Sequence, residues 1–469
     1  MCALTVASNT KLPEVAFLVY APTRQRRADN SFEGNDNIGA KVVEDVLCRA
    51  GIRVGRCSPE TAKNFRLVLV SFTSTFDVFA FYRAVALIPS WQPKRRAFKV
   101  LAGGFGMQNP APVRHFIDYA AFGRVDNWVT GVVDAILGGS EPAHESVMNL
   151  PDIHQVKISQ PSSLYPYLVS GWSESFTGCP LKCKFCHYTY ARKHSGSNEA
   201  YGQYVQSGFT GGSSPELTWD GLFTWGKKLG RVRVAIDGFS ERLRYVYGKR
   251  ISNDDIVAGL ETVGQYEGIT TVLTYNIGNF PGETEEDRHD LYQTLRRVNP
   301  KNRVIFVLCT TPFRPSAATP MQWEPVSLFP NWYNERARVI VEENNFRAVH
   351  SFTLETSYSH ACAVIAERIT VNDDELFHAI CFAPGLQRDN HDMRLKRLQA
   401  NFNLTSFLRE YDVNEEHPSQ FLTSYIERDT MKRIAIKMRT QAAKTKDTRG
   451  WLPGRVSMVQ GRLGVTVTR

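Results

Sequence analysis

Three cysteines lie within one short stretch of the chain, Cys179-Pro-Leu-Lys-Cys183-Lys-Phe-Cys186, with the spacing C-x3-C-x2-C. The other cysteines are scattered singly along the sequence. A loop of this length can turn three thiolates inward onto one inorganic cluster, and it offers no obvious fourth ligand. Three thiolates on a 4Fe–4S cluster leave one iron open to bind a further molecule. The spacing therefore predicts a metal site at Cys179, Cys183 and Cys186.

Two other metal sites use the same residues. The three cysteines with His187 or His194 form a ligand set for a structural zinc ion. The segment Cys183-Lys-Phe-Cys186-His187 also fits the C-x-x-C-H pattern of c-type haem attachment. That attachment normally follows export, and residues 1–13 lack the basic and apolar regions of a secretory signal. A disulfide is disfavoured in a chain without such a signal.

The cysteine spacing, with the aromatic Phe185 before the last cysteine, resembles the signature of the radical S-adenosylmethionine (SAM) family. The resemblance implies that the open iron binds the amino and carboxylate groups of SAM. It implies that one electron from the cluster cleaves SAM to a 5′-deoxyadenosyl radical. It also implies an external one-electron reductant of the flavodoxin or ferredoxin type. In such enzymes the cofactor carries the difficult chemistry and the protein positions it.

Further segments resemble motifs of the same family and follow in the expected order. They are the glycine-rich turn at 207–214, the Ser-Glu-Arg-Leu segment from Ser240, the turn Gly-Asn-Phe-Pro-Gly-Glu-Thr at 278–284, and the proline-rich stretch 311–323. The residues that the resemblance implies in SAM binding are Gly211, Gly212, Ser240, Glu241, Arg242, Asn279 and Pro281. Ser240 is also a candidate N-cap for a helix that starts at Glu241. Asn279 stands where the family has glycine, and asparagine tolerates the left-handed backbone of such a turn.

The first 140 residues predict a parallel Rossmann-like sheet. Apolar strand-like runs at 15–20, 67–72 and 98–102 alternate with helical spacing, for example over 40–50. The last of these runs ends in the glycine-rich turn 103–106, which fits either phosphate binding or a tight structural turn.

The segment 101–123 is similar to the cobalamin-binding-type domain that precedes many radical SAM cores. It lacks the Asp-x-His-x-x-Gly pattern that ligates cobalt, and His115 is the only histidine before residue 141. We therefore expect the fold of that domain and do not expect cobalamin as a cofactor.

The whole chain is predicted to be an α/β protein in several parts. Residues 1–140 form the Rossmann-like domain, 141–163 a linker, 164–375 a partial (β/α) TIM-type radical SAM barrel, and 376–469 a mostly helical basic extension. A strand at 165–171 would lead into the cysteine loop, because such barrels place their chemistry at the carboxyl ends of strands. Helices are expected within the extension at 390–408 and 418–440.

Composition and charge restrict the partners. The chain has 469 residues and a formal net charge of +9, with no apolar run long enough to span a bilayer. From Met431 to Arg469 there are ten Lys or Arg residues and one acid, Asp447, so this tail carries the whole positive excess. Such a tail fits a nucleic acid or nucleotide, and it also fits an ordinary solvated helix face. We expect a cytoplasmic protein without a membrane partner.

These observations predict a radical SAM enzyme that abstracts hydrogen from its substrate. The favoured reaction is an isomerisation of a modified nucleotide, such as an amino-acid-modified thymidine in phage DNA, which would place the enzyme in the host cytoplasm. One alternative is a cobalamin-dependent radical SAM methyltransferase acting on a small molecule. The other is a zinc-structured nucleic-acid-binding protein that uses the same cysteines and the same tail.

Overall fold

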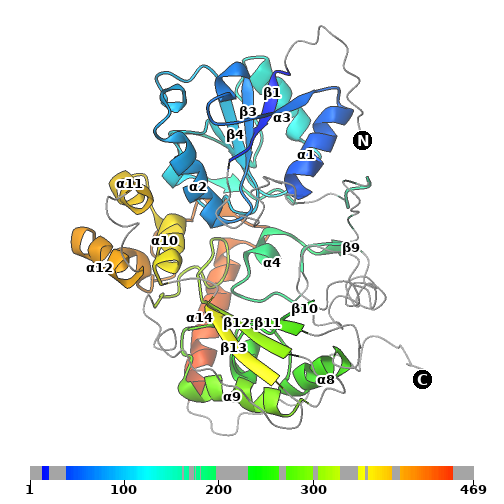
Figure 1. The fold of residues 1–469 in the computed structure, drawn as a ribbon, viewed down its shortest axis with the longest axis vertical. Helices are drawn as coiled ribbons and strands as arrows, with labels where there is room; N and C mark the ends of the chain where they lie inside the picture. The colour runs from blue at the N-terminus through cyan, green and yellow to red at the C-terminus, as the bar shows by residue number, and fades with distance from the viewer. Residues whose placement is uncertain are drawn as a thin grey trace.

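The structure is a computed structural model, and it describes a large part of the chain. The described residues are 13–20, 38–160, 163–167, 169, 174, 176–179, 181–196, 231–263, 271–298, 305–327, 347–353, 357–382 and 391–446. The two larger sheets lie at opposite ends of the molecule, with the short helix α4 (His187–Ala191) between them (Figure 1).

The N-terminal part forms a six-stranded sheet with the order β2-β1-β3-β4-β5-β6. The strands are β1 (Val15–Leu18), β2 (Val54–Cys57), β3 (Leu67–Ser71), β4 (Lys99–Gly103), β5 (Tyr119–Ala121) and β6 (Val147–Asn149). Neighbouring strands are parallel except for β5 and β6. Because the order reverses at β1, this is a doubly wound α/β sheet, as the sequence predicts.

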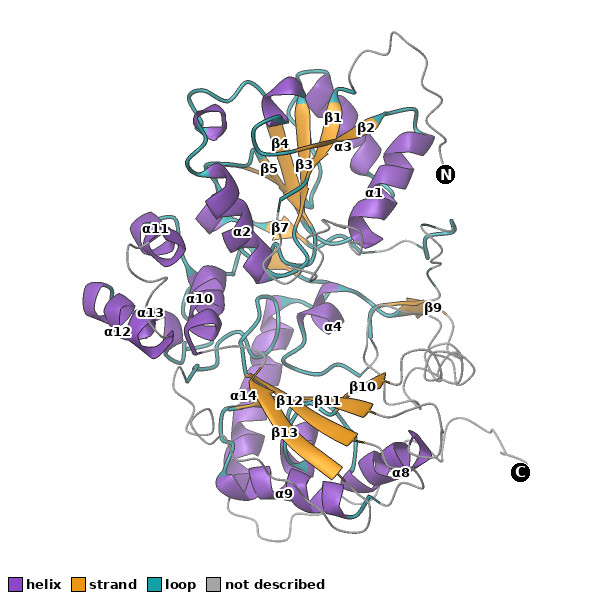
Figure 2. Cartoon of the chain, in the orientation of Figure 1, coloured by secondary structure: helices purple, strands orange, loops and turns teal. Residues whose placement is uncertain are grey.

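Helices cover both faces of this sheet (Figure 2). They are α1 (Ile38–Arg49), α2 (Thr75–Val85) and α3 (Val129–Leu137). Successive side chains of a strand point to opposite faces. Ala16, Val68 and Val70 share one apolar cluster with α2. Val15, Leu67 and Leu69 share another with α1 and α3. Burial on both faces explains why these strands are almost continuously apolar in sequence.

The second sheet has four parallel strands in sequential order: β10 (Arg231–Ala235), β11 (Thr271–Gly278), β12 (Ile305–Pro312) and β13 (Arg347–Thr353). Helices α7 (Glu241–Val246) and α8 (Asn253–Val263) connect β10 to β11, and α9 (Glu285–Arg296) follows β11. Sequential parallel strands joined by helices are the arrangement of a (β/α) barrel segment. The mixed α/β class and the parallel sheets are confirmed.

The C-terminal part is mostly helical. Its elements are α10 (Ser357–Arg368), α11 (Asp374–Phe382), α12 (His391–Asn401), α13 (Thr405–Leu408), β14 (Leu422–Thr423) and α14 (Arg428–Lys446). Helices α10 and α11 share the apolar cluster of α2, so they pack on the first domain. Helix α14 runs beside the second sheet (Figure 1). None of the described helices has the length and apolar character that crossing a bilayer requires.

Several local predictions differ from the structure. The stretch 141–163, predicted as a linker, contains β6 and also β7 (Val156–Lys157), which pairs with β14. Residues 163–167 form no strand, and the Tyr165 hydroxyl donates to Asp45 at 2.6 Å. The helix predicted from residue 418 begins only at Arg428, because the residues before it pair with β7. These contacts join segments that are far apart in the sequence, so local sequence patterns cannot predict them.

Candidate metal centre

The cysteine loop lies between the short strand β8 (Phe176–Thr177) and helix α4. The Cys186 backbone N–H donates to the Cys183 carbonyl oxygen at 3.0 Å, which closes the second half of the loop. Lys182 has a φ of 53°, so the chain turns sharply just before Cys183. Cys183 is buried, while Cys179 and Cys186 are partly exposed. The motif therefore folds into a tight turn whose middle thiol faces the interior.

The loop is clamped to the end of helix α7. The Lys184 backbone N–H donates to the Tyr247 carbonyl oxygen at 2.8 Å. Gly248 has a φ of 87°, and a Cβ atom added there would lie 2.9 Å from the Lys182 carbonyl oxygen. Only glycine suits both this backbone conformation and this close approach. Since α7 follows β10, the clamp fixes the cysteine loop at the carboxyl edge of the second sheet.

An aromatic cluster connects the loop to the turn after β11. The Phe185 ring lies 5.4 Å from the Phe280 ring, and Phe280 stacks on Tyr247 with 4.5 Å between centroids. The Tyr247 hydroxyl donates to the Pro281 carbonyl oxygen. Asn279 has a φ of 59°, so its predicted left-handed conformation is confirmed. The structure thus brings the cysteine loop and the Asn279–Pro281 turn together, and their assignment to SAM binding stays a prediction.

A buried ion pair lies beside the cysteines. The Lys249 side chain is almost fully buried, and its Nζ donates to Asp237 Oδ2 at 2.6 Å and to the Ala235 carbonyl oxygen at 2.7 Å. Burial by itself lowers the pKa of Lys249, but the Asp237 carboxylate outweighs it and the pKa lies above its ordinary value. Lys249 is therefore a fixed positive charge next to the loop.

The three thiols influence one another electrostatically. Burial raises the pKa of Cys183 well above its ordinary value, the Lys249 ammonium opposes that rise, and the thiols of Cys186 and Cys179 add to it. Burial also raises the pKa of Cys186, with Cys179 contributing. Deprotonation of these buried thiols needs a compensating cation, and a bound metal centre supplies one. Three thiols that act on one another electrostatically, next to a buried ammonium, form a donor set whose chemistry fits an iron–sulfur cluster.

The two histidines near the cysteines are held by backbone carbonyls. His187 Nδ1 lies 2.6 Å from the Ala317 oxygen, and His194 Nδ1 lies 3.2 Å from the Thr177 oxygen. Burial lowers the pKa of His187 to about 4. In the described ranges, no group of three or more His, Cys, Asp or Glu side chains could hold a single metal ion.

Ser240, Glu241 and Arg242 lie at the start of α7. Ser240 caps this helix as predicted, because its Oγ accepts from the Leu243 N–H. The same Oγ donates to Asp287 at 2.5 Å, and Arg242 pairs with Asp287 as well. Glu241 accepts from the Asn253 N–H at 2.8 Å. These contacts join α7 to the neighbouring helices, and SAM binding by the three residues remains a prediction.

Gly211 and Gly212 lie outside the described residues. Asp237, Lys249 and Phe280 were not among the predicted site residues. Asp237 follows a strand and precedes a glycine, a position where functional side chains often lie in parallel sheets. Lys249 belongs to no motif and gave no local signal.

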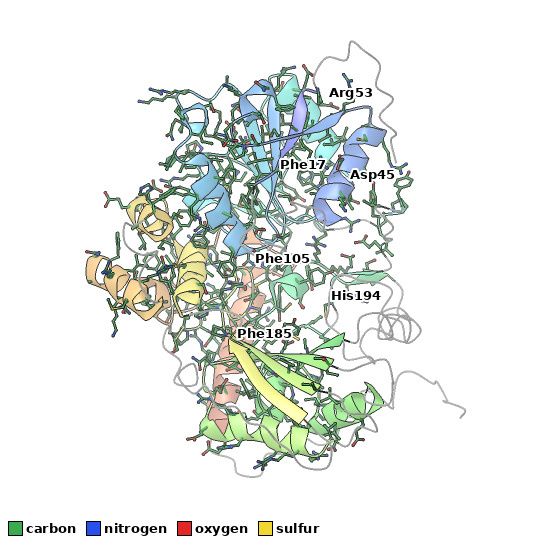
Figure 3. The ribbon with its side chains drawn as sticks, in the orientation of Figure 1. Phe17, Asp45, Arg53, Phe105, Phe185 and His194 are labelled. Carbon is green, nitrogen blue, oxygen red and sulfur yellow. The ribbon has the colours of Figure 1, made fainter. Side chains whose placement is uncertain are left out.

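The first domain contacts the centre through the turn after β4. Phe105 comes from this turn and Phe185 from the cysteine loop, and both lie between the two sheets (Figure 3). The Phe105 ring lies 5.3 Å from the His187 ring. A Cβ atom at Gly104 would lie 2.4 Å from the Phe72 carbonyl oxygen, and one at Gly106 would lie 2.4 Å from Ser74 backbone atoms. The turn therefore packs against the backbone of residues 72–74, which follow β3, and this favours the structural interpretation over phosphate binding.

A histidine-ligated cobalamin on the first domain would need a histidine of that domain that is free to bind cobalt. His115 pairs instead with Asp374 at 3.2 Å, and Arg114 donates to the same carboxylate at 2.5 Å. This group of side chains joins the first domain to α11. His115 therefore does not fit as a cobalt ligand, and we derive no step from cobalamin.

No protein-family description matches the chain, and no curated protein matches it. Among solved structures, the chain is similar to the cobalamin-dependent S-adenosylmethionine radical enzyme OxsB with aqua-cobalamin bound, at 10% identity over 93% of this chain and 80% of that chain, with a TM-score of 0.44. The form with aqua-cobalamin and S-adenosylmethionine bound gives 11% identity, the same coverage and a TM-score of 0.42. The apo, selenomethionine-labelled form gives 12% identity over 91% and 56% of the two chains, with a TM-score of 0.29. These likenesses are too weak to assign a family, so the site is interpreted from its own residues.

Proposed function

We propose that the chain is a radical SAM enzyme that holds a 4Fe–4S cluster on Cys179, Cys183 and Cys186. The observation that carries this proposal is the clamp that fixes the three-cysteine loop at the carboxyl edge of the second sheet, beside the Asn279–Pro281 turn. When bound, such a cluster supplies one electron that splits SAM into methionine and a 5′-deoxyadenosyl radical, which takes a hydrogen atom from the substrate to give 5′-deoxyadenosine.

The residues around the loop have distinct tasks in this proposal. The cysteine thiolates bind the cluster, and the buried Lys249 ammonium offsets part of their negative charge. The rings of Phe185, Phe280 and Tyr247 exclude water from one side of the loop. Positioning matters more than acid–base catalysis here, because a misplaced radical reacts with its nearest neighbour.

We further propose an isomerisation of a modified nucleotide, such as an amino-acid-modified thymidine in phage DNA. The support is the basic excess of residues 431–469, which suits a polyanionic substrate. Methyl transfer through a histidine-ligated cobalamin is less well supported, because His115 is engaged by Asp374. A cytoplasmic setting suits a cluster held by reduced thiols.

The test is anaerobic reconstitution followed by two measurements. We expect close to four irons and four sulfides per chain, and 5′-deoxyadenosine formation from SAM with a low-potential reductant. Cys183→Ala should remove both iron and 5′-deoxyadenosine. The exposed Cys48→Ala is the matched control and should retain both.

Other outcomes would overturn the proposal in identifiable ways. Zinc without iron on the same cysteines would favour a structural nucleic-acid-binding protein. Cobalamin bound after anaerobic purification, together with methylated product, would favour a methyltransferase. Loss of iron in Cys48→Ala but not in Cys183→Ala would place the cluster elsewhere.

A further inference from the structure

Three cations from separate segments lie near one another beside the cysteine loop. We call Lys184, Arg250 and Lys437 the loop-side basic patch. Lys184 stands in the loop itself between Cys183 and Phe185. Arg250 follows Gly248 of the clamp by two residues, and Lys437 lies on α14. Arg250 and Lys437 are exposed, and Lys184 is half-buried.

Packing brings these segments together. Phe185, Val246 and Met438 belong to one apolar cluster, and they stand close in sequence to Lys184, Arg250 and Lys437, respectively. The Lys184 Nζ donates to the Val246 carbonyl oxygen, which holds this ammonium against the end of α7. The geometry of α7, α14 and the loop therefore sets the patch.

The positive charge of the patch is not neutralised within the described ranges. Lys437 and Arg250 lie close enough to Lys184 for their positive charges to act on it. Arg439, farther along α14, differs because it pairs with Glu324 at 2.7 Å and with Glu410 at 2.8 Å. No ion pair with a described carboxylate involves Lys184, Arg250 or Lys437. Like charges held together without counter-charges raise the free energy of the unbound protein and favour an anionic partner.

We propose that the loop-side basic patch is the docking surface for an acidic one-electron carrier protein. This inference rests on the proposed function, because a cluster that cleaves SAM must receive an electron from outside. Electron transfer weakens steeply with distance, so the carrier must approach the cluster closely. Lys184 is adjacent in sequence to the ligand Cys183, which makes the patch a surface close to the thiolates.

A nucleic acid is the less suitable occupant of this patch. Duplex binding needs cations spread along a phosphate backbone, whereas these three charges are gathered around one loop. Residues 447–469 carry four arginines and one aspartate, spaced along the sequence as a polyanion contact needs. The two surfaces therefore have separate partners in this proposal.

The test uses the iron-loaded full-length protein and a reduced flavodoxin. The variant Arg250→Glu/Lys437→Glu reverses two charges of the patch. Its matched control, Lys63→Glu/Lys94→Glu, changes the net charge equally at exposed lysines of the first domain. Stopped-flow absorbance gives the second-order rate of cluster reduction at low ionic strength. Fluorescence anisotropy of labelled flavodoxin gives its affinity.

We expect the patch variant to lower the flavodoxin rate constant and affinity by at least about tenfold, as lost electrostatic steering does. Its reduction by a small photoreduced deazaflavin should stay unchanged, and the control variant should behave like the unaltered protein. If flavodoxin reduced the cluster of the iron-loaded patch variant at an unchanged rate, the docking proposal would be wrong and the proposed function would stand. Weakened DNA binding with an unchanged flavodoxin rate would overturn it too, and would assign the patch to nucleic acid. Failure of the unaltered chain to hold iron would overturn the proposed function and this proposal with it.

Discussion

The ammonium of Lys249 lies 2.6 Å from the carboxylate of Asp237, and this buried pair adjoins Cys183. Asp237 stands just beyond the end of β10 with a φ of 50°, and Lys249 follows the glycine that contacts the cysteine loop. The pair therefore connects the sheet edge to the clamp. Its positive partner also acts on the thiols.

Lys249→Met should destabilise the protein and change the cluster. Removing one partner leaves the Asp237 charge largely buried, so the free energy of unfolding should fall by about 3 kcal/mol. The cluster's reduction potential should become more negative, because a nearby positive charge favours the added electron. Denaturant unfolding and a redox titration followed by electron paramagnetic resonance measure the two effects.

The double variant Lys249→Met/Asp237→Asn separates these effects. Asparagine tolerates the left-handed backbone at residue 237 and carries no charge. Most of the lost stability should return. If the potential of the Lys249→Met protein matched that of the unaltered protein, the electrostatic role of Lys249 would be disproved.

Gly248→Ala should weaken iron binding. The new Cβ would lie 2.9 Å from the Lys182 carbonyl oxygen, so the cysteine loop must shift. The positive φ adds a cost of roughly 1–2 kcal/mol. Gly282→Ala is the control, because Gly282 has a φ of 79° but no atom within 4 Å of the added Cβ. Iron per chain should fall in Gly248→Ala and stay normal in Gly282→Ala, and equal iron in both variants would refute the clamp.

Glu283 should make stability depend on pH. Burial raises the pKa of Glu283 to about 7, although Arg288 opposes the rise. A carboxyl group whose folded pKa is raised stabilises the fold below its unfolded pKa, and this contribution disappears as the pH rises through the folded pKa. The unfolding free energy should therefore decline between about pH 4.5 and about pH 7.

Glu283→Gln should remove this part of the pH dependence. The difference in unfolding free energy between Glu283→Gln and the unaltered protein should change by up to about 3 kcal/mol across that pH interval. Denaturant unfolding at several pH values measures it. Parallel pH profiles for the two proteins would show that Glu283 ionises normally.

Removing residues 447–469 should weaken DNA binding. The segment carries four arginines and one aspartate. Its loss should make the plot of log affinity against log salt concentration less steep, by up to about 4 in the magnitude of the slope. The cut must follow α14, because Met438 and Ala435 of that helix are buried and Arg439 pairs with Glu324. Iron content should be retained, and unchanged DNA affinity at all salt concentrations would exclude this segment as the nucleic-acid contact.

Local chemistry in the sequence determined several elements and part of the candidate site. Apolar runs predicted the strands around Val68 and Val100, and the spacing of Cys179, Cys183 and Cys186 predicted the loop. Ser240 was predicted as an N-cap and Asn279 as a left-handed residue, and the structure confirms both. These features depend on neighbouring residues, so a short window of sequence contains the information.

Only the tertiary structure decided which distant segments meet. The Lys249–Asp237 pair, the clamp of Gly248 on Lys182, and the pairing of β7 with β14 join parts that no local pattern connects. The loop-side basic patch exists because α14 packs on α7, although its residues look like ordinary surface lysines and arginines in sequence. Such contacts depend on how whole elements pack, and that packing follows from burial of apolar surface over the entire chain rather than from any one motif.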